Sequence, residues 1–253
     1  MAKMKTKREY GKAGTIGIGV PQANTTIESE FRVLAPAGVN VITARLQGSR
    51  SDSRQRLLDY FHTLDATIDT FDSAPLNAFG FACTGSSYLL GAEKDRAAFA
   101  ELSKRRGYPV VPATAAILES LAQVGARCIA LVSPYPAWLT DAALGYYRDA
   151  GIDVAEVVQV EADTADTRNV YNITSADAVA AAKRLKRKDV GALLLSGTGM
   201  PTLGAIGELS RSTGKPVLSS NLCLAWALGK RLGLAGAPPW AERTGWEAQL
   251  ARL

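Results

Sequence analysis

The sequence Phe81-Ala82-Cys83-Thr84-Gly85 closes one apolar, strand-like run, and Leu195-Ser196-Gly197-Thr198-Gly199 closes another. The segments 109–113 and 216–220 follow them at similar offsets and also match, so the chain reads as two copies of one unit. Duplicated strand ends that face each other across a pseudo-twofold axis would place Cys83 opposite Gly197. Only the first copy keeps a thiol.

Short apolar runs bounded by Gly or Pro alternate with longer segments of helical period. Strands are expected near residues 15–20, 41–46, 78–83, 110–111, 128–132, 154–160, 192–196 and 217–219. Helices are clearest at 52–68, 114–124, 175–185 and 203–210. The alternation predicts an α/β fold of two pseudo-symmetric lobes, each a parallel sheet flanked by helices, with the active site in the cleft between them.

The same pattern suggests where the lobes begin and end. Residues 1–13 are rich in lysine and predict a disordered basic tail. Lobe one is expected to comprise 14–115 together with 221–253, and lobe two 116–220.

Composition places the chain among ordinary globular proteins, with 253 residues, 47% of them hydrophobic and 21% charged. The lack of a long apolar run and of a signal peptide predicts a cytoplasmic protein without a membrane partner. Three cysteines, an odd number, favour reduced thiols over a disulfide framework. The net charge of +5 lies partly in the tail and partly in 183–188, without interleaved aromatic residues, so nucleic acid is not an expected partner. Trp240 and Trp246 leave a homo-oligomer open.

Small polar residues follow four of the expected strands, at 21–26, 83–87, 133–136 and 196–199. Such strand ends, with the backbone N–H groups of the helices that follow them, are typical binding sites for a carboxylate or phosphate. No phosphate-binding loop occurs, and the only histidine, His62, has no partner for a metal. We therefore expect the ligand to be a carboxylate or a phosphate, and the chemistry to proceed without histidine and without a metal.

Cys83 is the candidate for chemistry because of its position. At a strand end beside a helix start, a thiol meets donors that are expected to lower its pKa toward neutrality, where it exchanges protons with a carbon acid. Cys128, inside a strand, and Cys223, on an apolar helix face, instead fit buried hydrophobic residues.

The segments 20–28, 82–84, 133–135, 197–203 and 215–221 together resemble the aspartate/glutamate racemase superfamily, and within it the branch of maleate cis-trans isomerase and arylmalonate decarboxylase. The resemblance implies catalysis by two opposed cysteines without a cofactor. Cys83 matches the first position, whereas Gly197 occupies the second. It further implies that the substrate carboxylate is bound by Asn24, Tyr135, Asn169, Thr84 and the backbone from Gly197 through Thr198 to Gly199.

The reactions of that superfamily differ in how many acidic or basic groups they need, and this chain offers one thiol at the site. Racemisation needs an acid or base on each face, and Gly197 offers neither. Decarboxylation of a malonate-type acid needs one proton donor, Cys83, while donors from Thr84, Gly85, Tyr135 and Thr198 stabilise the enediolate. Cis-trans isomerisation by thiol addition remains an alternative, as does a sensor that binds a carboxylate without turning it over.

Overall fold

A computed structural model describes residues 9–163, 166–234, 250 and 252. Most of the predicted basic tail, together with Trp240 and Trp246, lies outside the described residues.

The first half of the chain runs through β1 (Gly14–Pro21), α1 (Thr26–Leu34), β2 (Val39–Leu46), α2 (Ser53–His62), α3 (Leu64–Asp69), β3 (Ala78–Phe81), α4 (Thr84–Leu90), α5 (Ala92–Arg106), β4 (Val110–Pro112) and α6 (Ala113–Gln123). The second half runs through β5 (Cys128–Ser133), α7 (Ala137–Asp149), β6 (Asp153–Gln159), the 3₁₀ helix η1 (Thr167–Asn172), α8 (Ser175–Ala182), β7 (Ala192–Leu195), α9 (Leu203–Thr213), β8 (Val217–Ser219) and α10 (Ser220–Arg231).

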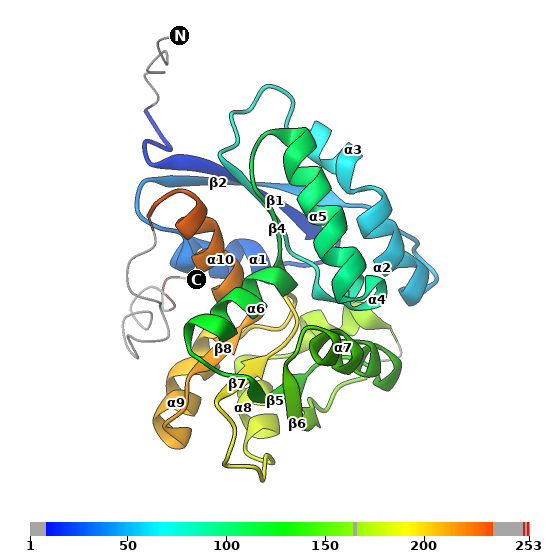
Figure 1. Cartoon of the computed structure of the whole chain (residues 1–253), viewed down its shortest axis with the longest axis vertical. Coiled ribbons are helices and arrows are strands. Elements are labelled where there is room, and N and C mark those ends of the chain that lie inside the picture. The colour runs from blue at the N-terminus through cyan, green and yellow to red at the C-terminus, as the bar shows by residue number, and fades with distance from the viewer. Residues whose placement is uncertain (1–8, 164–165, 235–249, 251, 253) are drawn as a thin grey trace.

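The strands form two four-stranded parallel sheets with one shared topology, β2-β1-β3-β4 and β6-β5-β7-β8. Figure 1 shows the first sheet above the second, with helices on their faces and with α6 and α10 between them. The strands β3 and β7 are each third in the strand order of their own sheet, so the strand ends that precede Cys83 and Gly197 are structurally equivalent. The predicted α/β fold with two sheet-and-helix units is confirmed.

Several element boundaries differ from the sequence expectation, and two of the differences are larger in consequence. The strand β3 ends at Phe81, so Cys83 is the residue immediately before α4 and not a strand residue. The helix expected at 52–68 is divided into α2 and α3 at Thr63. The Thr63 hydroxyl donates to the carbonyl oxygens of Asp59 and Gln47, a local bond that competes with helix continuation.

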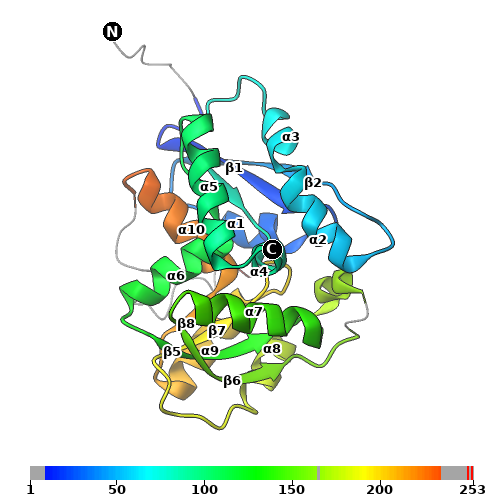
Figure 2. The same ribbon diagram turned by 45° about the vertical axis from the view of Figure 1, so that its right-hand side comes forward.

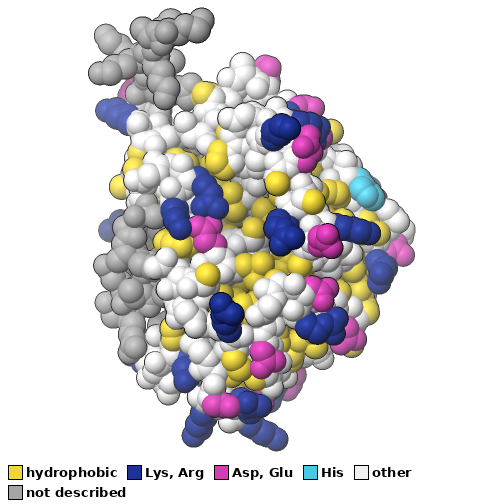
Figure 3. Space-filling model, viewed as in Figure 1, with side chains coloured by type: hydrophobic (Ala, Val, Ile, Leu, Met, Phe, Trp, Pro, Cys, Tyr) yellow, Lys and Arg dark blue, Asp and Glu magenta, His cyan; other side chains and the backbone are white. Residues whose placement is uncertain are grey.

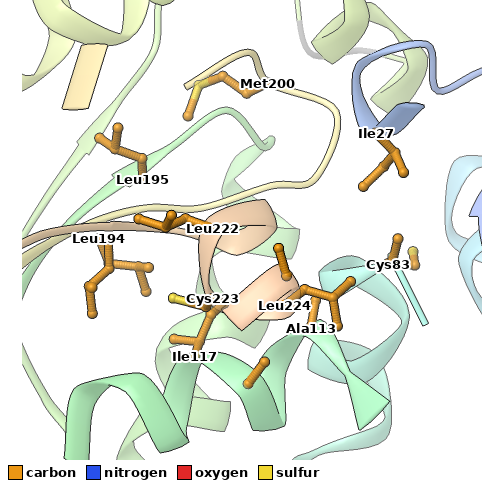
Figure 4. Close-up of a cluster of buried hydrophobic side chains, with 14 of the residues drawn as sticks. Ile27, Cys83, Ala113, Ile117, Leu194, Leu195, Met200, Leu222, Cys223 and Leu224 are labelled. Carbon is orange, nitrogen blue, oxygen red and sulfur yellow. The ribbon is translucent and has the colours of Figure 1, made fainter. Parts of the chain in front are cut away.

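The helices α6 and α10 pack against each other and carry the core from one sheet to the other (Figure 2). Figure 4 shows Ile117 of α6 beside Cys223 of α10, with Leu224 directed toward Ala113. Cys223 is completely buried, as expected for a hydrophobic role, whereas Cys83 lies at the edge of this cluster. Because these two helices touch strands of both sheets, the lobe boundaries at 115/116 and 220/221 stay a prediction.

No helix within the described ranges is long and apolar enough to cross a membrane.

Candidate functional site

Cys83 lies in the short connection between β3 and α4, with an extended backbone at φ −143° and ψ 98°. Its side chain faces the interior, and the residue is only 4% exposed.

The environment of the thiol overturns one expectation. Burial raises the pKa of Cys83, and this effect exceeds the lowering by the Ser86 hydroxyl and by the N–H groups of Gly85 and Ser86. The Ser86 Oγ lies 3.1 Å from the Cys83 Sγ but donates to the Leu57 carbonyl oxygen at 2.5 Å. It can donate to a thiolate only by leaving that carbonyl. The predicted lowering of the pKa was wrong, and the group is a neutral thiol at pH 7.

Thr84 and Tyr135 bring a second pair of hydroxyls to the same place from different lobes. The Thr84 Oγ1 and the Tyr135 oxygen are 2.8 Å apart, and both residues are buried. Tyr135 follows β5, and its pKa is raised by burial and by the neighbouring Tyr88 and Cys83, so the phenol stays protonated. Either hydroxyl of the pair can be the donor in this bond, and both are uncharged.

Gly197 and its successors form the facing wall. The Gly197 N–H donates to the Ser220 Oγ at 3.0 Å, and the Thr198 hydroxyl donates to the Ala82 carbonyl oxygen at 2.7 Å. These two predicted substrate donors therefore have partners within the protein. The Thr198 bond crosses between lobes and ends beside Cys83.

The backbone at Gly197 is suited to glycine. Its φ of +96° lies in a region that side chains rarely allow. A Cβ there would lie 2.8 Å from the Pro134 Cγ and 3.2 Å from the Tyr135 hydroxyl oxygen. A side chain at this position would therefore be strained, and the Tyr135 hydroxyl borders it.

Asn24 is completely buried at the start of α1. Its Oδ1 accepts from the Thr26 N–H at 2.9 Å and the Ile27 N–H at 3.3 Å. Its Nδ2 donates to the Thr198 Oγ1 at 3.4 Å, so it joins the Thr198 wall.

The structure thus gathers most of the predicted site residues: Asn24, Cys83, Thr84, Gly85, Tyr135, Gly197, Thr198 and Gly199. Asn169 lies on η1 and is half-buried, and in the described part of the chain no side-chain hydrogen bond joins it to the others. The binding of the substrate carboxylate by Asn169, which the resemblance implies, stays a prediction.

Sequence reasoning missed three tyrosines of this region, Tyr60, Tyr88 and Tyr171. Burial raises the pKa of each phenol, and the interaction with Cys83 adds a smaller increase. Tyr171 stands two residues from Asn169 and packs on Gly199, where a Cβ would overlap its ring. Its adjacency to the predicted Asn169 was the available signal.

A buried ion pair fastens η1 over this region. The Arg56 side chain is 2% exposed, and its Nη2 lies 2.6 Å from the Asp166 Oδ1 and 3.1 Å from the Thr167 hydroxyl. Arg56 lowers the pKa of Asp166 together with Arg168, the larger contributor, to about 2. Since the Arg56 charge is already paired, the donors closest to Cys83 are neutral.

A separate hollow of about 770 Å³ opens elsewhere, between α5, β4 and the end of α7. Its lining includes Phe99, Val110, Leu118 and Tyr146, and Figure 3 shows hydrophobic side chains gathered on this face. None of the predicted site residues lines it, so it is not the candidate site.

Comparison with known proteins resolves the family. The family model of arylmalonate decarboxylase matches residues 16–243, almost the entire described chain. The chain belongs to the arylmalonate decarboxylase family. Relatives of this chain include the maleate isomerases of Alcaligenes faecalis (27% identical, covering 90% of this chain and 94% of the relative) and Geobacillus stearothermophilus (27%, 87% and 92%).

Solved structures share the fold of this family member. The maleate cis-trans isomerase of Nocardia farcinica bound to TRIS superimposes with a TM-score of 0.78 at 24% identity, covering 87% of this chain and 93% of that one. Arylmalonate decarboxylase superimposes with a TM-score of 0.74 at 20% identity, covering 88% and 94%. The resemblance stated from the motifs is confirmed, and so is the expectation of an enzyme of the isomerase or lyase kind.

Proposed function

We propose that this protein decarboxylates a malonate-type acid and protonates the resulting enediolate from a single thiol. The observation that carries the proposal is the asymmetry of the site. Cys83 is a buried thiol whose pKa is raised by burial, and the equivalent position of the second copy is Gly197, whose positive φ disfavours a second thiol. One acid on one face is what this reaction requires.

The chemistry proceeds without a second base. One carboxylate of the substrate is held by neutral donors, and the bond from the α-carbon to the other carboxylate breaks, releasing CO₂. The electron pair of that bond remains as an enediolate. The Cys83 S–H then gives its proton to the α-carbon, and the thiolate recovers a proton from water. Because the proton arrives from the Cys83 face only, the product has a single handedness.

Charge develops on the retained carboxylate, so donors aimed at it lower the barrier. The Tyr135 phenol and the Thr84 hydroxyl form a 2.8 Å pair that turns toward a substrate oxygen at the cost of one internal bond. In comparable sites one such donor lowers the activation barrier by about 3 kcal/mol, which raises the rate roughly 10²-fold. Preorganisation by burial strengthens this effect because no water has to reorient.

Cis-trans isomerisation is the second candidate, and the curated relatives favour it. They are named maleate isomerases, and a solved cysteine-to-serine mutant of the Nocardia farcinica enzyme carries a covalently bound succinylcysteine intermediate. Cys83 supplies one nucleophile for such an addition. The raised pKa argues against it, since addition needs the thiolate.

Incubation with methyl(phenyl)malonate and with maleate separates the candidates. We expect CO₂ from the first and no fumarate from the second, with one solvent deuterium incorporated into a single enantiomer. Fumarate formation without CO₂ would assign the isomerase reaction instead. Binding of both acids in calorimetry without turnover of either would assign the carboxylate sensor.

The pH dependence of kcat/KM distinguishes an acid from a nucleophile. A general acid must be protonated, so activity is expected to stay level through neutral pH and to fall only above the ordinary thiol pKa of about 8.5, since burial raises the pKa of Cys83. Burial raises the pKa of the Tyr135 phenol well above its ordinary value of about 10, so we expect this phenol to stay protonated across neutral pH. Rates that instead rise from pH 6 to 9 would identify a thiolate nucleophile.

A further inference from the structure

Glu30 is a buried carboxylate that the proposed chemistry does not use. It lies on α1, is 4% exposed, and its pKa is raised by burial. No cation pairs with it within the described residues. Its partners are neutral donors from Thr202, Leu203 and Asn221, so burying its charge is costly to stability.

The contacts of Glu30 converge on the segment that follows Gly197. Its Oε1 accepts from the Thr202 N–H at 2.6 Å and from the Leu203 N–H at 3.1 Å, at the start of α9. Its Oε2 accepts from the Asn221 Nδ2 at 2.7 Å. The carboxylate therefore binds the far end of the loop and a residue of α10 together.

Asn221 carries the connection to the site. The same Nδ2 donates to the Thr198 carbonyl oxygen at 3.1 Å. Because both neighbours on this side are acceptors, only the amide NH₂ can face them, which leaves the Asn221 Oδ1 buried without a donor in the described structure. The Asn221 Nδ2 thus binds both Glu30 and the Thr198 carbonyl oxygen, while the Asn221 Oδ1 is left without a hydrogen-bond donor.

A second α1 residue acts on the same loop. Thr26 precedes Glu30 by one helical turn, on the same face of α1, and its hydroxyl donates to the Gly199 carbonyl oxygen at 2.7 Å. The carbonyls of Thr198 and Gly199 are therefore both fixed from lobe one. Because each peptide unit is planar, fixing these two carbonyl groups also fixes the directions of the N–H groups of the residues that follow them, Gly199 and Met200.

We propose that Glu30 is a positioning residue, which acts through Asn221 and the start of α9 to fix the Gly197–Gly199 backbone against the bound carboxylate. The inference rests on the proposed function for its effect on turnover. Its effect on the loop itself is independent of the substrate.

Glu30→Gln tests the proposal while preserving shape. The new amide NH₂ would oppose the Asn221 NH₂, so the link to Thr198 is expected to break. We expect kcat to fall about 10- to 100-fold with KM changed less than about 3-fold, the range for a misplaced transition-state donor. Amide hydrogen exchange is expected to rise in peptides covering 196–203 and to stay unchanged in the first sheet.

Glu208→Gln is the matched control, because Glu208 is an exposed residue of α9 that pairs with Lys183. It should alter neither kcat nor exchange. Unchanged exchange at 196–203 in Glu30→Gln would overturn the proposal even if the substrate assignment were wrong. Increased exchange there with no turnover of either acid by the wild type would instead sustain the positioning role and refute the proposed reaction.

The double variant Glu30→Gln with Asn221→Asp separates stability from positioning. In this variant the amide NH₂ at position 30 donates to the carboxylate at position 221, so the bond between the two side chains is restored. The carboxylate at position 221 has no N–H to give to the Thr198 carbonyl oxygen. We expect the thermal midpoint to recover relative to Glu30→Gln while kcat stays low. Recovery of kcat together with stability would show a merely structural role and overturn the proposal.

Discussion

Replacing Cys83 by alanine is expected to lower kcat/KM for the malonate substrate at least about 10³-fold, since the only proposed proton donor is removed. The fold should survive, because the thiol is a small group at the edge of the buried cluster. Substrate affinity should change little, as the carboxylate is held by other groups. Steady-state CO₂ release and calorimetric binding measure the two quantities separately.

Cys83→Ser sharpens this test. Serine keeps the size and the neighbour at Ser86, but an unactivated hydroxyl is a far weaker acid than a thiol. We expect a loss close to that of alanine. Cys128→Ala is the control, because Cys128 is a free, half-buried cysteine at the start of β5. Wild-type rates in Cys83→Ala would exclude the thiol from the reaction.

The sequence predicted the architecture because the relevant signals are local. Apolar β-branched runs that end in Gly, Pro and small polar residues marked each strand, and the repeated tripeptides around Thr84 and Thr198 marked the equivalence of β3 and β7. The ends of β3 and β7 belong to different sheets, and the repeated tripeptides predicted that these ends face each other; the Thr198 bond to the Ala82 carbonyl oxygen joins the two segments.

The properties that decide the chemistry were not local. The expectation of a lowered pKa for Cys83 counted the donors of the following helix but not the desolvation that complete burial imposes on the thiol. The pair of Glu30 and Asn221 joins residues 191 positions apart, each of which reads alone as an ordinary polar residue near a helix start. Burial and long-range pairing arise only when the lobes pack together.

Introducing the missing thiol by Gly197→Cys is expected to damage the protein and not to convert it into a two-thiol enzyme. The φ of +96° costs a non-glycine residue about 1–3 kcal/mol. The new Cβ would also press on Pro134 at 2.8 Å. We expect the free energy of unfolding to fall by about 2–4 kcal/mol in total, and kcat/KM to fall at least about 10-fold, because Tyr135 must move from its bond with Thr84.

Gly145→Cys supplies the comparison for this variant. Gly145 lies in α7, has no positive φ, and a Cβ there meets only the end of the Arg148 side chain at 3.8 Å. Stability within about 1 kcal/mol of wild type is expected from helix propensity alone. Chemical denaturation and chiral product analysis measure both variants. Gly197→Cys could instead prove as stable as Gly145→Cys and interconvert maleate and fumarate, or racemise the product. The backbone at position 197 would then not disfavour a second thiol, and the decarboxylation proposal would lose its structural basis.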